Sequence, residues 1–365
     1  MARRVRLRIP HRPAERASHR TARRPRTGAR MNARIRSLAQ SRGAGPAGLA
    51  CAVLAPFLIA TPYALNVMTS AAIFVMLAVG LNIVVGYCGL LDLGYAAFFA
   101  VGAYTAGVLS TEFGLSLAAT VPVVIAVTVL AGVLVGIPTL RLRSDYLAIV
   151  TLGFGEIIRI VANNLDITGG PSGIYGIPGL SLFGFSLEGP VSLYYLVVVI
   201  VALAVLLAGR LDRSRLGRAW RFIREDEDAA EAMGVHTYRV KLAAYIAGAV
   251  WGGLAGVLFA AQLSAVSPES FRFIQSALVL MAVVLGGMGS LRGVVIGAVC
   301  ISLVPELLRG VADNRYFAFG LVLIAVMVLR PQGLWPRAAR EPAATARRSG
   351  NRTAPPPVPA QKEAR

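Results

Sequence analysis

The chain has 365 residues, of which 56% are hydrophobic and only 15% are charged. Soluble domains rarely sustain that composition over several hundred residues, so a soluble protein is excluded and a polytopic membrane protein is indicated. The net charge of +19 would fit a nucleic-acid-binding protein, but nearly all of it lies near the two ends of the chain.

Both ends are rich in Arg, Pro and Ala. Fourteen arginines precede Gly43, and seven Lys or Arg residues follow Arg330, which leaves the body of the chain nearly neutral. We expect disordered basic tails over 1–43 and 335–365, with a transmembrane domain over 44–334 between them. Translocating many arginines is disfavoured, so both tails are expected in the cytoplasm. Met31 lies inside the first tail, and the thirty residues before it are expected to be an over-extended start or dispensable.

Apolar runs of about twenty residues, the length that crosses a bilayer, predict about ten transmembrane helices and an all-α fold. The predicted spans are Gly48–Asn66, Met68–Tyr87, Leu90–Ser110, Ser116–Pro138, Asp145–Ala162, Val191–Gly209, Val240–Gln262, Phe273–Met288, Gly293–Leu308 and Tyr316–Leu329. Glycines crowd the second and third spans, which predicts a re-entrant or broken element near Tyr87 to Tyr95. With the N-terminus inside, the arginine-rich connections fall in the cytoplasm, and the connection 163–190, which has no Lys or Arg, falls outside.

One long polar segment interrupts this lipid-adapted chain at 210–240. Four acids from Glu225 to Asp228 precede an alanine-rich run, and Gly234 provides a C-terminal stop, so a short helix is predicted from Arg224 to Gly234. An apolar stripe is expected to seat in a groove of a water-soluble partner, and its members are Trp220, Ile223, Ala230 and Met233. A solvated loop whose charges only fix the topology remains the alternative.

Charged residues inside the spans are costly in lipid, so each such side chain is expected to face a charged partner, water or the protein interior. Glu156 and Arg159 lie three residues apart and are expected to pair on one helix face, beside Gly153 and Gly155. A substrate pathway and a structural ion pair are both open for this face. Asp92 is a further pathway candidate, although a turn in this glycine-rich stretch would also explain it.

The sequence contains no phosphate-binding loop of the Gly-x-x-x-x-Gly-Lys-Ser/Thr type, so ATP hydrolysis would require a separate subunit. His and Cys residues are isolated, and neither a metal site nor a cofactor is expected. The chain is therefore expected to be non-enzymatic. The rivals are an ion-coupled secondary transporter, which would need buried mid-span carboxylates, and a membrane-embedded enzyme, which would need a catalytic constellation.

The polar segment resembles the EAA loop of ABC importer permeases, the cytoplasmic helix that seats in a cleft of the ATPase subunit. The match consists of Asp228-Ala229-Ala230, three residues and Gly234. Asp228 stands where the loop usually has Glu, and the usual Ile-x-Leu-Pro tail is missing after Gly234. The resemblance implies ATPase-coupling roles for Arg224, Glu225, Asp226, Asp228, Ala229, Ala230 and Gly234.

Further stretches, in order, resemble the branched-chain amino acid ABC permease family of the LivM type over roughly Leu65 to Leu334. They are Asp145–Gly153, Thr168–Pro171, Gly217–Gly234, Ser267–Phe271, Gly286–Ser290 and Arg330–Leu334. The resemblance implies a permease in the plasma or inner membrane that translocates leucine, isoleucine or valine. Its expected partners are a second homologous permease, two ATP-binding subunits and an external substrate-binding protein. Relatives that carry other amino acids, amides or urea keep the substrate open.

Overall fold

The computed structural model describes residues 61–140, 144–182, 185–186, 189–307 and 333–335, with positions 56, 320, 321, 324 and 328. The chain divides into two units, Met1–Gly48 and Leu49–Arg365, and every described residue belongs to the second. The tails predicted at 1–43 and 335–365, apart from Trp335, and most of the first and last predicted spans lie outside the described residues.

The described chain is mainly helical. Its helices are α3 Pro62–Leu81, the π-helix η1 Asn82–Tyr87, α4 Ala96–Thr111, α5 Leu117–Thr139, α6 Ser144–Asn164, α7 Pro190–Arg213, α8 Arg215–Glu225, α9 Glu227–Ala232, α10 Thr237–Leu263, α11 Phe273–Gly286 and α12 Leu291–Leu307. Within the described residues, five helices are long and apolar enough to cross a membrane: Pro62–Tyr87, Leu117–Thr139, Tyr146–Asn164, Pro190–Arg213 and Thr237–Leu263. Helices α4 and α11 are apolar but shorter. A helical polytopic architecture is thus confirmed.

The boundary predicted between the first two spans, at 66–68, is wrong. Helix α3 runs without a break from Pro62 to Leu81. Thr61 is extended, and Pro62 occupies the first helical turn, where the missing proline N–H costs no hydrogen bond. The proline therefore sets the start of this helix, which the apolar run alone did not locate.

Helix α10 is central to the described bundle and packs against α3, α4 and α5. Its close approach to α4 depends on glycine, because a Cβ at Gly102 would overlap the backbone of Gly253. A Cβ at Gly256 would likewise overlap the backbone of α4 at Phe99 and Ala103. Small residues of this kind let two membrane helices pack backbone to backbone.

The interruption predicted near Tyr87 to Tyr95 is confirmed: η1 ends at Tyr87 and α4 begins at Ala96. Side chains from distant helices satisfy the backbone of the intervening segment. Thr151 Oγ1 on α6 accepts from Leu93 N at 3.1 Å, and Ser276 Oγ on α11 accepts from Ala96 N at 2.8 Å. A non-helical backbone is tolerated at membrane depth only where protein or water supplies such partners.

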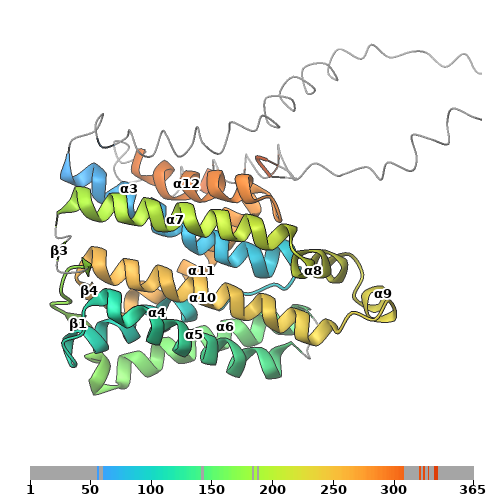
Figure 1. The fold of residues 1–365 in the computed structure, drawn as a ribbon, viewed down its shortest axis with the longest axis horizontal. Helices are drawn as coiled ribbons and strands as arrows, with labels where there is room; N and C mark the ends of the chain where they lie inside the picture. The colour runs from blue at the N-terminus through green and yellow to red at the C-terminus, as the bar shows by residue number, and fades with distance from the viewer. Residues whose placement is uncertain are drawn as a thin grey trace, which may run out of the picture. The chain divides into compact units, whose positions relative to one another are not determined.

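Figure 1 shows α8 and α9 at one end of the bundle and the short strands at the opposite end. Strand β1 (Ile174–Tyr175) pairs antiparallel with β4 (Ala265–Val266), and β2 (Ser181–Leu182) with β3 (Phe185–Ser186). Single 3₁₀ turns, η2 (Asp166–Thr168) and η3 (Pro268–Phe271), accompany them. The all-α prediction omitted these two-residue strands, which are too short to leave a periodic pattern in the sequence.

Candidate functional site

The polar segment forms two helices, so the single helix predicted from Arg224 to Gly234 is wrong. Helix α8 ends at Glu225, and Asp226 adopts an extended backbone with φ −158°. Its carboxylate then caps α9 by accepting from Ala229 N at 3.0 Å. An N-terminal Asp starts a new helix in this way because it satisfies a backbone N–H that has no intrahelical partner. Gly234, with φ +83°, follows the end of α9.

The predicted partner-facing apolar stripe is also wrong. Trp220, Ile223 and Ala230 are 1%, 5% and 1% exposed and pack into the core of this chain, whereas Met233 is 80% exposed. Trp220 Nε1 donates to Val240 O on α10 at 2.8 Å. The physical reason is tertiary packing, because the side of α8 and α9 that carries Trp220, Ile223 and Ala230 rests on the core of this chain. The stripe therefore anchors α8 and α9 to the bundle.

Arg224 connects this anchored pair of helices to the transmembrane helices. Its guanidinium donates to Gly86 O in η1. Its aliphatic stem passes Gly89, where a Cβ would lie 2.9 Å from Arg224 Cγ. A Cβ at Gly289, in the turn between α11 and α12, would lie 2.8 Å from Arg224 Nη1. The arginine thus lies where η1, the segment after it and the α11–α12 turn meet.

Asn82 completes this junction and was missed from the sequence. It is fully buried at the start of η1, and its Oδ1 accepts from Gly289 N at 2.9 Å. A side chain at Gly86 would overlap the Asn82 amide. An amide inside an apolar run was the available signal, because a buried polar group needs a partner. We call the set Asn82, Gly86, Arg224 and Gly289 the junction.

A second contact ties α9 to α10. Lys241 Nζ, on a side chain that is 8% exposed, pairs with Glu227 Oε1, on a side chain that is 47% exposed. The buried ammonium requires this partner, since an unpaired buried charge is strongly destabilising. Helices α8 and α9 are therefore fixed to α10 at Val240 and Lys241, and to η1 at Gly86.

The outer face of α8 and α9 remains exposed. Glu225, Asp228, Ala229 and Gly234 all lie on it, while Ala230 is buried. Phe222 and Met233 add apolar surface there, at 60% and 80% exposed. Aromatic residues and methionine are the types enriched at protein–protein interfaces, so Phe222 and Met233 are the part of this face that favours contact with another protein.

The predicted pairing of Glu156 with Arg159 is confirmed, with Glu156 Oε2 and Arg159 Nε 2.8 Å apart. The two side chains are 33% and 25% exposed. A Cβ at Gly153 would meet no atom within 4 Å, whereas one at Gly155 would lie 3.4 Å from Gly94 Cα. Open space therefore adjoins the ion pair at Gly153, and Gly155 serves close packing.

Asp92 lies apart from that pair in the interruption between η1 and α4. It is fully buried, and its Oδ1 accepts from Gly94 N at 2.9 Å. This bond shapes a turn, as the sequence allowed, and does not cap α4, whose N-cap residue is Tyr95. Glu306 contacts the Tyr63 hydroxyl.

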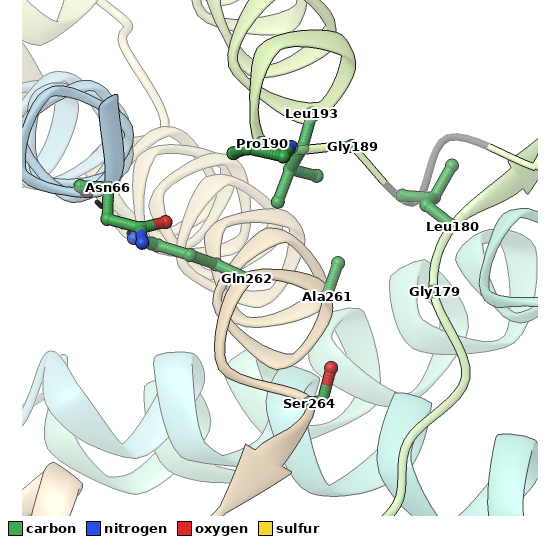
Figure 2. Close-up of a pocket in the computed structure, with 9 residues that line it drawn as sticks. All are labelled: Asn66, Gly179, Leu180, Gly189, Pro190, Leu193, Ala261, Gln262 and Ser264. Carbon is green, nitrogen blue, oxygen red and sulfur yellow. Dashed lines mark hydrogen bonds between the residues drawn. The ribbon is translucent and has the colours of Figure 1, made fainter. Parts of the chain in front are cut away.

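Two cavities lie toward the end opposite α8 and α9. The outer cavity has a volume of about 290 Å³ and lies between α3, α7 and the end of α10 (Figure 2). The second cavity, which we call the inner cavity, has a volume of about 260 Å³, is open on one side and lies between α3, α4, α10, α11 and α12. Gln262 lines both cavities. Figure 2 shows its side chain extending from α10 toward Asn66 on α3.

Across the described residues, no group of three or more His, Cys, Asp or Glu side chains is placed to hold a metal ion. Apolar helices of membrane-spanning length, glycine-mediated packing, an interrupted helix and partly open cavities are typical of a polytopic membrane permease.

Comparison with known families agrees with this class and narrows it. Residues 63–329 match the family described as the permease component of the branched-chain amino acid transport system, and the chain belongs to that family.

Several relatives carry names of the same kind. The chain is 43% identical over 312 residues to the high-affinity branched-chain amino acid transport system permease protein LivM of Salmonella typhimurium, covering 79% of this chain and 73% of the relative. LivM of Escherichia coli is 42% identical over the same shares. The autoinducer 2 import system permease protein LsrC of Yersinia enterocolitica is 26% identical, covering 72% of this chain and 73% of the relative. No solved structure matches the chain.

Proposed function

We propose that this protein is the transmembrane permease subunit of an ATP-driven importer of leucine, isoleucine or valine. The observation that carries the proposal is the α8–α9 pair, which has an exposed, EAA-like outer face and a buried inner face joined to the transmembrane helices. Family membership and the 43% identity to a permease named for branched-chain amino acids support the substrate class.

A separate ATPase would act on the exposed face of α8 and α9. Arg224, Glu225, Asp226, Asp228, Ala229, Ala230 and Gly234 are the proposed coupling residues. Because Ala230 is buried and Asp226 caps α9, these two act by holding the helix in shape. Displacement of the pair would move α10 through Val240 and Lys241, and the η1 region through Arg224. Rigid helices would convert this displacement into alternating access.

The transporter as a whole would contain a second homologous permease, two ATP-binding subunits and an external substrate-binding protein. We propose about ten transmembrane helices in the plasma or inner membrane, with both termini, the tails 1–43 and 335–365, and the coupling loop 210–240 in the cytoplasm. The cavities would then face outward. Glu156, Arg159, Gly153, Gly155 and Asp92 are proposed pathway residues, with an ion pair on a helix of membrane-spanning length as support.

The test is uptake of labelled leucine into proteoliposomes that contain this chain, its partner permease and the ATPases. Uptake is expected to require both ATP and the binding protein. A Glu225→Ala, Asp228→Ala variant is expected to hydrolyse ATP without uptake, and it leaves the capping Asp226 intact. Leucine uptake driven by an ion gradient through this chain alone would instead establish a secondary transporter.

Substrate selection needs its own measurement, because one relative is named for autoinducer 2 import. Competition by isoleucine and valine, but not by amides or urea, is the result expected for a branched-chain amino acid importer.

A further inference from the structure

We propose that the inner cavity binds the amino acid during transport, and that Gln262 both contacts the charged ends of the amino acid and separates this cavity from the outer one. The inference rests on the proposed function, because it assigns the substrate a place within the same transporter. It adds a binding site and a residue that neither the sequence pattern nor the family assigns.

The wall of the inner cavity suits a branched aliphatic side chain. Phe74, Phe99, Phe259 and Leu278 contribute to it. The rings of Phe99 and Phe259 meet edge to face with centroids 5.1 Å apart, so this part of the wall is well packed. Its volume of about 260 Å³ lies just below the roughly 300–1,000 Å³ typical of drug-sized ligands and fits one small metabolite.

The polar part of the lining is neutral. It consists of Ser70, Gln262, Gln275 and Ser302, and none of the described residues that line the cavity is charged. Amides and hydroxyls both donate and accept hydrogen bonds, so the same groups can receive an ammonium and a carboxylate. A buried charge is costly unless it is hydrogen-bonded, and a lining without fixed charge therefore favours a zwitterion of zero net charge over an ion.

Gln262 is the one described residue that lines both cavities, which is why we assign it to the partition between them. Its Nε2 donates to Asn66 O at 2.9 Å and to Ser70 Oγ at 2.8 Å, and both acceptors belong to α3. A shift of α10 against α3 breaks these bonds, which opens the partition and frees the amide for the substrate.

The same helix links the partition to the coupling end. Gln262 is one residue from the end of α10, and Val240 and Lys241 near its start are held by α8 and α9. One rigid helix therefore connects the surface on which an ATPase would act to the residue that closes the cavity.

The test is substrate selectivity, expressed as the ratio of leucine to phenylalanine uptake by the complete transporter, because this ratio does not depend on the amount of folded protein. Leu278→Ala enlarges the cavity and is expected to lower the ratio about tenfold. This is the low end of the discrimination between substrates that a change of a few methylene groups in an apolar pocket produces. Leu278→Phe fills the cavity and is expected to reduce leucine uptake while alanine uptake persists. Leu280→Ala is the matched control, because Leu280 lies on the same helix and does not line the cavity.

Gln262→Leu is expected to raise the leucine concentration needed for half-maximal uptake about 10- to 100-fold. This factor is the one expected when hydrogen bonds from the amide to the charged ends of leucine are lost. Unchanged ratios in both Leu278 variants, beside ATP-dependent leucine uptake by the wild type, would overturn this inference alone. A wild-type transporter without ATP-dependent leucine uptake would overturn the proposed function as well. A changed ratio in the Leu278 variants with Leu280→Ala at the wild-type value supports the site.

Discussion

Replacing Arg224 with Ala tests the transmission step at the junction. The guanidinium is the connection from α8 to Gly86 O, and no other contact of α8 at this carbonyl replaces it within the described residues. Removing the side chain keeps the Asp226 cap and the other exposed coupling residues, Glu225, Asp228, Ala229 and Gly234, in place. We therefore expect ATP hydrolysis to continue while leucine uptake falls.

The magnitude follows from the lost hydrogen bond. A bond from a charged donor contributes about 1.5–3 kcal/mol net, and because Arg224 is partly exposed to solvent, the lower end, about 1.5 kcal/mol, applies. That energy corresponds to roughly a tenfold change in an equilibrium between two conformations. The number of leucine molecules transported per ATP hydrolysed should fall by about this factor.

Arg221→Ala is the matched control for this measurement. Arg221 lies three residues earlier on α8 and donates to Gly217 O and Asp212 O, both at 3.1 Å, so its contacts stay within the α7–α8 corner. Both variants are reconstituted with the same partners, and leucine uptake and phosphate release are measured together. Equal coupling ratios for Arg224→Ala and Arg221→Ala would refute transmission through the junction.

Three further predictions concern the cap, the helix packing and the ion pair. Asp226→Ala removes the cap and is expected to destabilise α9 by about 0.5–2 kcal/mol, which is measured as faster amide hydrogen exchange at 229–230. Asp226→Asn keeps a capping oxygen and is expected to restore the protection. Equal exchange rates in the two variants would contradict the capping role. Gly102→Ala is expected to lower the melting temperature in detergent through overpacking of about 1–3 kcal/mol, while Gly153→Ala, which meets no atom, leaves it unchanged. Glu156→Gln is expected to reduce the amount of protein in the membrane, and Glu156→Gln with Arg159→Gln to restore it. If the pair lines the pathway, the double variant stays poor in uptake, whereas normal uptake would assign it a structural role.

The helices were largely predictable because length and hydropathy decide which segments enter a bilayer. The interruption after Tyr87 was also predictable, since glycines mark places where backbones meet or unwind. The start of α3 was not predictable from hydropathy, because the apolar run continues past this point to Asn66. Only Pro62 marks the residue at which the helix begins.

The candidate site was predictable in position but not in orientation. The segment that carries Arg224 to Gly234 stood out as polar, yet the side of it that faces this chain is set by contacts with α10 and η1. Trp220 looked like a contact for a partner because its true acceptor, Val240 O, lies twenty residues away. Asn82 and Gln262 are single amides in apolar helices, and their partners come from helices that the sequence does not bring together.

The interrupted segment between η1 and α4 also bears on how the protein is made. Leu93 N in this segment and Ala96 N at the start of α4 are satisfied by Thr151 and Ser276, which the ribosome adds more than fifty and about 180 residues later. Until those helices arrive, these groups lack partners in hydrocarbon, where each costs several kcal/mol. The early helices therefore have to wait near water or beside the insertion machinery for the later ones. Biogenesis of this chain is consequently a cooperative closing of the whole bundle, and a fragment that ends before α11 should be degraded rather than accumulate in the membrane.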